Sequence, residues 1–308
     1  MRTLSIGADL RLPAGQVMHA LVQARFDRAI HLTLDDGRLL TLLQGDSPRG
    51  MRVINVDRMD WPALHRCLDA GSHATLSGTQ LTHARFVLPL DGASLWRSPE
   101  LTGDEPPAEA VQACRAWLHR RQGVAEAGMP VSAWRFWRAA LAAFIRIVDA
   151  LPSHVGADGA DKVDAAVGQA LGLGPGLTPS ADDMIAGLLI GLRMNPVMTR
   201  HTARLATSVR RHWHATSAAS RDALDQAMLG WVTSRMADVC MALTCAAEAD
   251  GLEHALSAQA AIGQYSGMDT LIGFCAGPEA GLADRSDATQ FQAGLQGRHT
   301  APYERISV

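Results

Sequence analysis

Residues 171–187 read LGLGPGLTPSADDMIAG. Three glycines on alternate positions and two prolines predict a stiff loop whose backbone N–H groups no large side chain covers. An apolar helix is predicted to follow over 182–193. Ser180 is expected to be its N-cap, with Asp183 three residues later completing a capping box. The stretch therefore predicts a sharp junction between a glycine-rich loop and a buried helix.

A glycine-rich loop at a helix N-terminus favours the binding of an anion. The first N–H groups of a helix lack partners within it, and the helix dipole is positive at that end. Phosphate and carboxylate groups bind such places. Gly174, Gly176, Thr178 and Ser180 are the residues expected to hold the anion. The alternative is a well-capped helix start with tight turns, although capping alone does not require three glycines in five residues.

Asp182 is the unusual member of this motif. A second carboxylate in the first helical turn suits the helix dipole but would repel an anionic ligand. Asp182 therefore either points away from the ligand or holds Mg²⁺ or an ammonium or amide group beside the anion. The sequence leaves this choice open, and magnesium is the one metal that we consider.

A second segment repeats the design of the first. Residues 263–273 read GQYSGMDTLIG, and Ser266, Asp269 and Gly273 follow Ser180, Asp183 and Gly187 at a constant offset. Ser266 and Asp269 are predicted to form another capping box, with Gly267 between them. The match indicates a pseudo-repeat whose two helix N-termini face one pocket. Chance recurrence of a common capping pattern is the alternative.

A third segment, HATSAASRD at 214–222, precedes a predicted long helix. Arg221 suits bidentate contact with an anion, and Ser217 adds a hydroxyl group beside it. Ordinary helix capping by Ser217 or Ser220 explains these residues equally well. The twelve histidines form no H-E-x-x-H motif, and neither a G-x-S-x-G elbow nor a Walker-type lysine loop is present.

The rest of the chain predicts an α+β protein, with a β-rich N-terminal module followed by a larger α-helical domain. Strands are expected at 29–34, 38–43, 51–56 and 80–88, with a hairpin turn at Asp35-Asp36-Gly37 and a helix over 60–70. The predicted division is 1–100 for the β-rich module, 101–280 for the helical domain with the anion-binding loop, and 281–308 for a tail.

Alanine-rich segments with helical spacing fill the second half of the chain. They are predicted helices over 108–121, 131–151, 161–171, 182–193, 199–213, 220–250, 252–262 and 267–276, with a polar loop from Pro278. The aromatic residues near Trp137 are expected to be core.

Composition excludes several classes of function. A net charge of −3 lacks the basic footprint of a nucleic-acid-binding protein. No apolar run is long enough to span a membrane, and the N-terminus has no signal-peptide core, so a cytoplasmic protein is expected. The five cysteines form no C-x-x-C pair and are expected to be reduced thiols. Lys162, the only lysine, lies in a polar stretch that is ill suited to Schiff-base chemistry.

The motifs resemble the signature of the AllH-type family, which is associated with the oxamate carbamoyltransferase of allantoin breakdown. GLGPGLTPSADD at 172–183 carries the resemblance, and Val17–Ala20, Arg28–Leu32, Thr216–Gly230 and Gly263–Gly273 support it. Ala181 stands where the family pattern has glycine. His19-Ala20 and Ile30-His31 also depart from it. These departures are expected of a divergent branch acting on another substrate.

The resemblance implies a subunit of a multi-protein transferase of purine catabolism, interconverting oxalurate plus phosphate with oxamate plus carbamoyl phosphate. Its substrate would be a small anion (phosphate, carbamoyl phosphate or an oxamate-like acid), and its partners the other subunits. Asp182, Asp183, Ser266 and Asp269 would form the catalytic group. A non-catalytic subunit that binds an anionic effector or docks a catalytic partner stays open, as does a purely structural protein.

Overall fold

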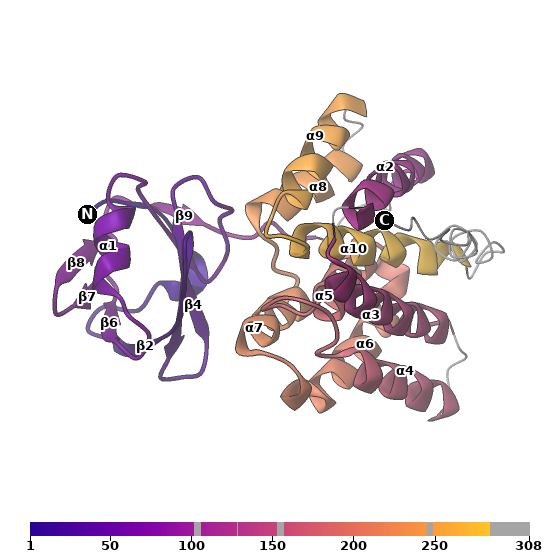
Figure 1. Cartoon of the computed structure of the whole chain (residues 1–308), viewed down its shortest axis with the longest axis horizontal. Coiled ribbons are helices and arrows are strands. Elements are labelled where there is room, and N and C mark those ends of the chain that lie inside the picture. The colour runs from indigo at the N-terminus through magenta and orange to yellow at the C-terminus, as the bar shows by residue number, and fades with distance from the viewer. Residues whose placement is uncertain (102–105, 128, 153–156, 245–248, 284–308) are drawn as a thin grey trace, which may run out of the picture.

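The computed structural model describes residues 1–101, 106–127, 129–152, 157–244 and 249–283. Figure 1 shows a β-sheet with one short helix at one end of the molecule and an assembly of helices at the other. The predicted α+β class is confirmed. The boundaries proposed at residues 100 and 280 stay predictions, and residues 284–308 of the predicted tail lie outside the described residues.

The strands of the described residues form one nine-stranded sheet that curls into a half-barrel. Its order is β8-β7-β6-β2-β3-β4-β5-β1-β9, and only the β4–β5 and β1–β9 pairs are parallel. The strands are β1 (Thr3–Gly7), β2 (Val17–Phe26), β3 (Ala29–Leu34), β4 (Leu39–Gln44), β5 (Val53–Val56), β6 (His73–Ser77), β7 (Gln80–His83), β8 (Phe86–Pro89) and β9 (Ser94–Trp96).

The predicted hairpin at Asp35-Asp36-Gly37 joins β3 to β4, and Gly37 has a φ of 85° there. Only glycine adopts such a conformation without strain. The single strand predicted over 80–88 is wrong, because the chain turns between His83 and Phe86 and continues as the antiparallel strand β8. In β2 the pairing with β3 shifts between Val22 and Ala24, so that Gln23 is the extra residue of a β-bulge.

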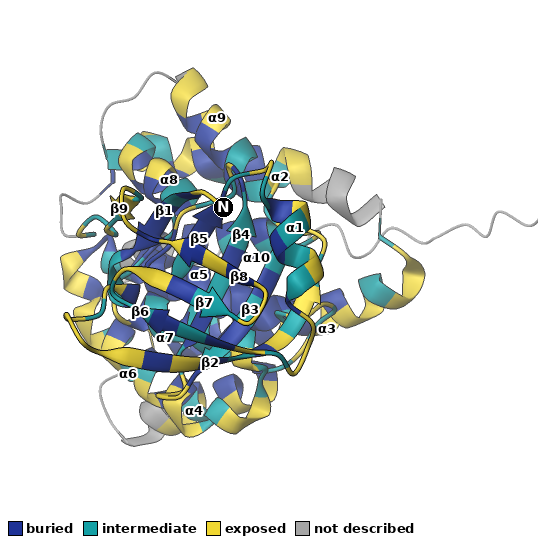
Figure 2. Cartoon of the chain, turned by 90° about the vertical axis from the view of Figure 1, so that its left-hand side faces the viewer, coloured by how far each residue is buried: buried dark blue, intermediate teal, exposed yellow. Residues whose placement is uncertain are grey.

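Two hydrophobic cores hold the molecule together. The first core is formed by alternate residues of the strands and by residues of the short helix α1 (Trp61–Cys67), and it includes Ile30, Leu42 and Trp61. Figure 2 shows the alternation of buried and exposed residues along the strands. The second core lies among the helices and includes the buried Trp137 and Phe144. The aromatic residues near Trp137 are thus partly core, as predicted, although Phe136 is 64% exposed.

The helices of the second part are α2 (Ala108–Ala127), α3 (Val131–Ala150), α4 (Ala157–Ala170), α5 (Ser180–Arg193), α6 (Thr199–Arg211), α7 (Ala218–Met228), α8 (Ser234–Thr244), α9 (Ala249–Ala260) and α10 (Ser266–Ala283). Short 3₁₀ turns lie at Ala8–Leu10, Pro196–Met198 and Trp213–Ala215. Helix α5 is buried along its length from Ser180 to Leu192, because its sequence after the first turn is apolar on every side.

Several predicted helix boundaries are wrong, since α2 continues to Ala127 and α4 begins at Ala157. The helix predicted over 220–250 is interrupted at Gly230, whose φ of 78° ends α7 before α8 begins. The loop predicted from Pro278 is instead helical as far as Ala283, with Pro278 inside α10. Cys67, Cys114, Cys240 and Cys275 form no disulfide among the described residues, and Cys245 lies outside them.

Polar contacts join the sheet to the helices. Arg52, which is 6% exposed, pairs with Asp9 beside the sheet at 2.7 Å and with Asp222 and Asp225 of α7 at 2.7 and 2.9 Å. A second contact is a reciprocal pair of hydrogen bonds between Arg49 and Ser234. These contacts fix α7 and the start of α8 against the sheet.

Candidate functional site

The glycine-rich loop before α5 has the backbone that its sequence predicts. Gly172, Gly174 and Gly176 have φ values of 82°, 119° and 99°. A Cβ on Gly172 would lie 2.3 Å from the Ala215 carbonyl oxygen, and one on Gly174 would lie 2.5 Å from the Ser180 backbone nitrogen. The first two glycines are therefore required by close packing as well as by backbone conformation.

Several N–H groups of this loop have no partner among the residues that the structure describes. Within the described residues, nothing accepts a hydrogen bond from the backbone N–H groups of Gly174, Gly176, Leu177, Thr178 or Ser180. Gly176 and Leu177 are exposed, and Gly174 and Thr178 are partly so. Ser180 is completely buried, so the residues from Gly174 to Thr178 are the ones that place unpartnered N–H groups near the protein surface, at the positive end of the α5 dipole.

The predicted capping box at Ser180 is wrong. Helix α5 begins at Ser180 itself, Pro179 occupies the N-cap position, and no side chain caps the helix. Ser180 is completely buried, and its hydroxyl group has no hydrogen-bond partner among the described residues. The box predicted at Ser266 and Asp269 is likewise not formed, because both side chains face residues of other segments.

Asp182 ties two loops together. Its Oδ1 accepts a hydrogen bond from the Gly172 N–H at 2.8 Å, and its Oδ2 accepts one from the Thr216 hydroxyl group. Burial raises the pKa of the Asp182 carboxyl, while the hydrogen bonds from Gly172 and Thr216 and the nearby Ser220 hydroxyl group oppose the rise. Of the two orientations left open by the sequence, the geometry favours the one in which Asp182 points away from a ligand.

Replacing Asp182 by asparagine is expected to destabilise the protein by about 1–3 kcal/mol, because an amide group would present a donor to N–H and O–H groups that need an acceptor. A ligand-binding role of Asp182, as the family resemblance implies, predicts instead lower ligand affinity or turnover with little change in melting temperature. Chemical unfolding of Asp182→Asn beside the exposed control Asp161→Asn measures the difference. An unchanged unfolding free energy with lost ligand affinity would restore the ligand-binding role.

The first and second motifs meet at Thr178. Its hydroxyl group donates to Asp183 Oδ2 at 2.9 Å and lies 2.8 Å from the Ser266 hydroxyl group of α10. The predicted convergence of the two helix N-termini is therefore present in the fold. Burial raises the pKa of Asp183 well above its usual range, and repulsion from Asp269 adds to the rise, while Ser266 and Thr178 oppose it.

Asp269 lies behind this junction and is 1% exposed. Its Oδ1 accepts a hydrogen bond from the indole N–H of Trp137 at 2.7 Å, and its Oδ2 has no partner among the described residues. Burial raises the pKa of Asp269 to about 7, although interactions with Ser180 and Trp137 lower it. The sequence predicted Trp137 only as a core residue. Its indole N–H connects it to the site through the hydrogen bond to Asp269.

The two motifs interact across the helix pair rather than within each helix. Ser180 lies near Asp269 and Ser266 lies near Asp183, so each hydroxyl group lowers the pKa of the carboxyl group on the other helix, although the Ser180 hydroxyl group and Asp269 Oδ2 form no hydrogen bond among the described residues. The backbones of α5 and α10 also approach each other reciprocally. A Cβ on Gly187 would lie 2.0 Å from the Thr270 carbonyl oxygen, and a Cβ on Gly273 would lie 1.8 Å from the Met184 carbonyl oxygen. Helix α10 thus packs closely against the face of α5 on which Gly187 lies. The constant offset in sequence reflects a pseudo-twofold contact in space.

The third motif touches the first through Ser217. Of the alternatives that the sequence left open, Ser217 forms the helix cap: it caps α7 by accepting a hydrogen bond from the Ser220 N–H, and its hydroxyl group also donates to the Leu177 carbonyl oxygen at 2.9 Å. Arg221, one turn later, lines a separate cavity beside the sheet. Gly267 packs against α9, where its N–H donates to Ile262, so this N–H group is not available to an anion.

The described part of the chain lacks two further features, a metal-binding cluster and a membrane-spanning helix. It contains no group of three or more His, Cys, Asp or Glu side chains placed to hold a metal ion. No helix in the same ranges has the length and apolar character needed to cross a membrane.

Comparison with known families gives one match. Residues 170–278 match the family described as oxamate carbamoyltransferase subunit AllH, which confirms the resemblance over this range. The matched range begins at the last residue of α4 and contains all three motifs. The segments near residues 17–32 that also resembled the family lie outside it. No solved structure matches the chain.

Proposed function

We propose that this chain is a subunit of a carbamoyltransferase that interconverts oxalurate plus phosphate with oxamate plus carbamoyl phosphate. The family match over residues 170–278 supports the reaction class. The observation that carries the proposed site is the meeting of both helix N-termini at Thr178, beside loop N–H groups that have no partner in the described residues. The phosphate group of the substrate binds there.

The buried carboxyl groups suit an anionic ligand because their raised pKa values favour the neutral form. Burial raises the pKa of Asp182, Asp183 and Asp269, and a protonated carboxyl group does not repel phosphate. Asp183 also fixes the Thr178 hydroxyl group by accepting its hydrogen bond. The site therefore combines N–H donors with Asp183, a carboxyl group whose raised pKa weakens its repulsion of a phosphate oxygen.

In the proposed reaction the amide nitrogen of oxamate attacks the carbonyl carbon of carbamoyl phosphate. A C–N bond forms, the C–O bond to phosphate breaks, and the nitrogen loses a proton as phosphate leaves. The loop N–H groups stabilise the leaving phosphate, and positioning supplies much of the remaining rate enhancement. Asp269, with a pKa of about 7, is matched to proton exchange near neutral pH.

The first test is thermal unfolding with phosphate, carbamoyl phosphate, oxamate or oxalurate, each with and without Mg²⁺. A ligand at a hundred times its dissociation constant is expected to stabilise the native protein by about 2.7 kcal/mol. Thr178→Val removes the hydroxyl group at the junction and is expected to weaken carbamoyl phosphate binding about tenfold, which corresponds to about 1.4 kcal/mol. Thr207→Val, on the exposed face of α6, is the matched control.

Turnover is measured in the complex purified through a tag on this chain. Carbamoyl phosphate formation from oxalurate and phosphate is expected in the wild-type complex and is expected to fall in the Thr178→Val complex. Binding without turnover in the assembled complex would favour the non-catalytic anion-binding subunit. No binding of any of the four ligands, by the chain or by the complex, would overturn the proposed site.

A further inference from the structure

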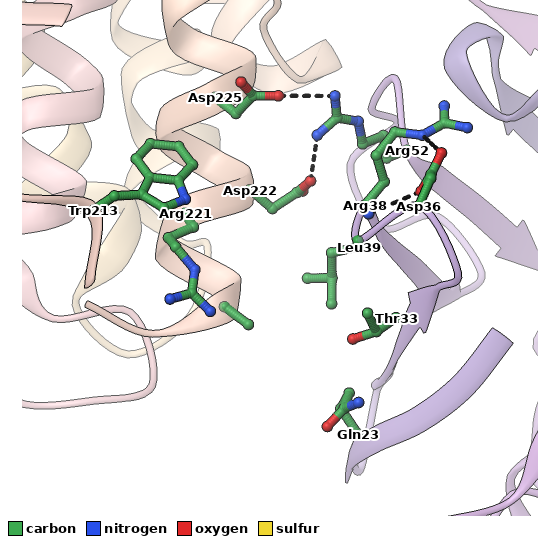
Figure 3. A pocket seen from close by; sticks show the side chains of 12 residues that line it. Gln23, Thr33, Asp36, Arg38, Leu39, Arg52, Trp213, Arg221, Asp222 and Asp225 are labelled. Carbon is green, nitrogen blue, oxygen red and sulfur yellow. Dashed lines mark hydrogen bonds and ion pairs between the residues drawn. The ribbon is translucent and has the colours of Figure 1, made fainter. Parts of the chain in front are cut away.

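A cavity of about 560 Å³ lies between the sheet and α7. No residue of the glycine-rich loop lines it. Arg221 lines the cavity on the α7 side, and Thr33 and Gln23 line it on the side of the sheet (Figure 3). Its volume is within the range of small-molecule sites, which often form where two structural units meet.

The backbone of β2 directs Gln23 into this cavity. Gln23 is the extra residue of the bulge between Val22 and Ala24, and bulges commonly turn a side chain toward a binding site. Neither the Gln23 amide nor the Thr33 hydroxyl group hydrogen-bonds to another side chain or backbone group that the structure describes. The sheet wall thus offers a paired donor and acceptor together with a hydroxyl group.

Among the described arginines that line the cavity, Arg221 is the one whose guanidinium is available to a ligand. The lining carboxylates are already ion-paired, since Asp36 contacts Arg38 at 2.6 Å, and Asp222 and Asp225 both contact Arg52. No described residue forms a hydrogen bond or ion pair with the Arg221 guanidinium. An unpaired guanidinium facing a cavity is suited to bidentate contact with a carboxylate or phosphate.

We propose that this cavity binds an organic anion of about the size of a nucleoside monophosphate. Its anionic group contacts Arg221, and a planar amide- or lactam-bearing group contacts Gln23 and Thr33. Trp213 and Leu39 supply apolar walls beside them. The cavity is larger than phosphate or a two-carbon acid needs, and one unpaired cation favours a single anionic group. This second site is separate from the one proposed at Thr178.

Isothermal titration of the full chain with uridine 5′-monophosphate tests the proposal. Uridine lacks the anionic group, and ribose 5-phosphate lacks the lactam-bearing ring. We expect saturable binding of the nucleotide, with both fragments at least about tenfold weaker. Arg221→Gln is expected to weaken nucleotide binding about tenfold and to leave uridine binding unchanged. Gln23→Ala is expected to weaken the nucleotide and uridine but not ribose 5-phosphate.

Matched variants separate the two sites. Arg200→Gln removes an exposed charge from a different helix, α6, and is the control for Arg221→Gln. Gln80→Ala removes an exposed amide from a different strand, β7, and is the control for Gln23→Ala. Neither control is expected to change nucleotide binding. Thr178→Val is expected to leave it unchanged as well. No nucleotide binding by the wild type, or equal loss in Arg200→Gln and Arg221→Gln, would overturn the proposal. Loss of carbamoyl phosphate binding in Arg221→Gln would show one shared site instead of two.

Discussion

Gly273→Ala is expected to destabilise the protein more than Gly267→Ala or Gly277→Ala, the corresponding substitutions at other glycines of α10. The new Cβ would lie 1.8 Å from the Met184 carbonyl oxygen, which is backbone and cannot rotate aside. Helices α5 and α10 would have to separate, and the buried contacts on both would be lost with them. Overpacking of this kind costs about 3 kcal/mol or more, which corresponds to a fall of at least about 6 °C in melting temperature.

Gly251→Ala provides the control, because Gly251 is exposed on α9. Alanine is the better helix former by about 1 kcal/mol, so this variant is expected to match or exceed the wild-type stability. Urea unfolding of both variants measures the contrast. Wild-type stability in Gly273→Ala would mean that the two helices do not pack backbone against backbone.

Protein stability is expected to fall as pH rises from about 4 to 7. Burial raises the pKa of Asp269 from 3.8 to about 7 in the folded state. Between these values the folded protein holds a proton that the unfolded chain has released, so raising the pH favours unfolding. At about 1.36 kcal/mol per pKa unit, Asp269 contributes about 4 kcal/mol that is fully present below pH 4 and lost above pH 7.

Asp269→Asn removes this titration and keeps an oxygen that can accept the Trp137 hydrogen bond. The variant is therefore expected to have a flatter stability profile between pH 4.5 and 7.5, measured by urea unfolding at several pH values. Asp183 and Asp182, whose pKa values are also raised, retain part of the slope. Asp46→Asn, in a highly exposed ion pair, is expected to keep the wild-type profile. A wild-type slope in Asp269→Asn would contradict the assignment.

Local patterns in the sequence predicted much of the fold. The turn at Gly37 and the glycine-rich loop were predictable because positive φ values favour glycine at identifiable positions. Helix spacing likewise located α3 and α5 to within about two residues. The break at Gly230 and the continuation of α10 through Pro278 were missed, because tertiary packing decides whether a glycine or proline ends a helix.

The site was predictable by residue type but not by pairing. The repeated Ser-x-x-Asp pattern correctly indicated two related helix starts, yet each serine faces the aspartate of the other helix. A capping box and a cross-helix pair have the same local sequence, so only the packing distinguishes them. Gln23 was missed for the same reason, because its bulge depends on the register between β2 and β3.

The order of synthesis places a demand on the helix pair. Ser180 and Ser266 are 86 residues apart, so a ribosome adding about 5–20 residues per second makes the start of α10 about 4–17 s after that of α5. During this interval the side of α5 that later packs against α10 has no partner and stays exposed to water. Chaperones that bind apolar segments therefore have a defined time window and a defined target, residues 184–192, on each newly made chain.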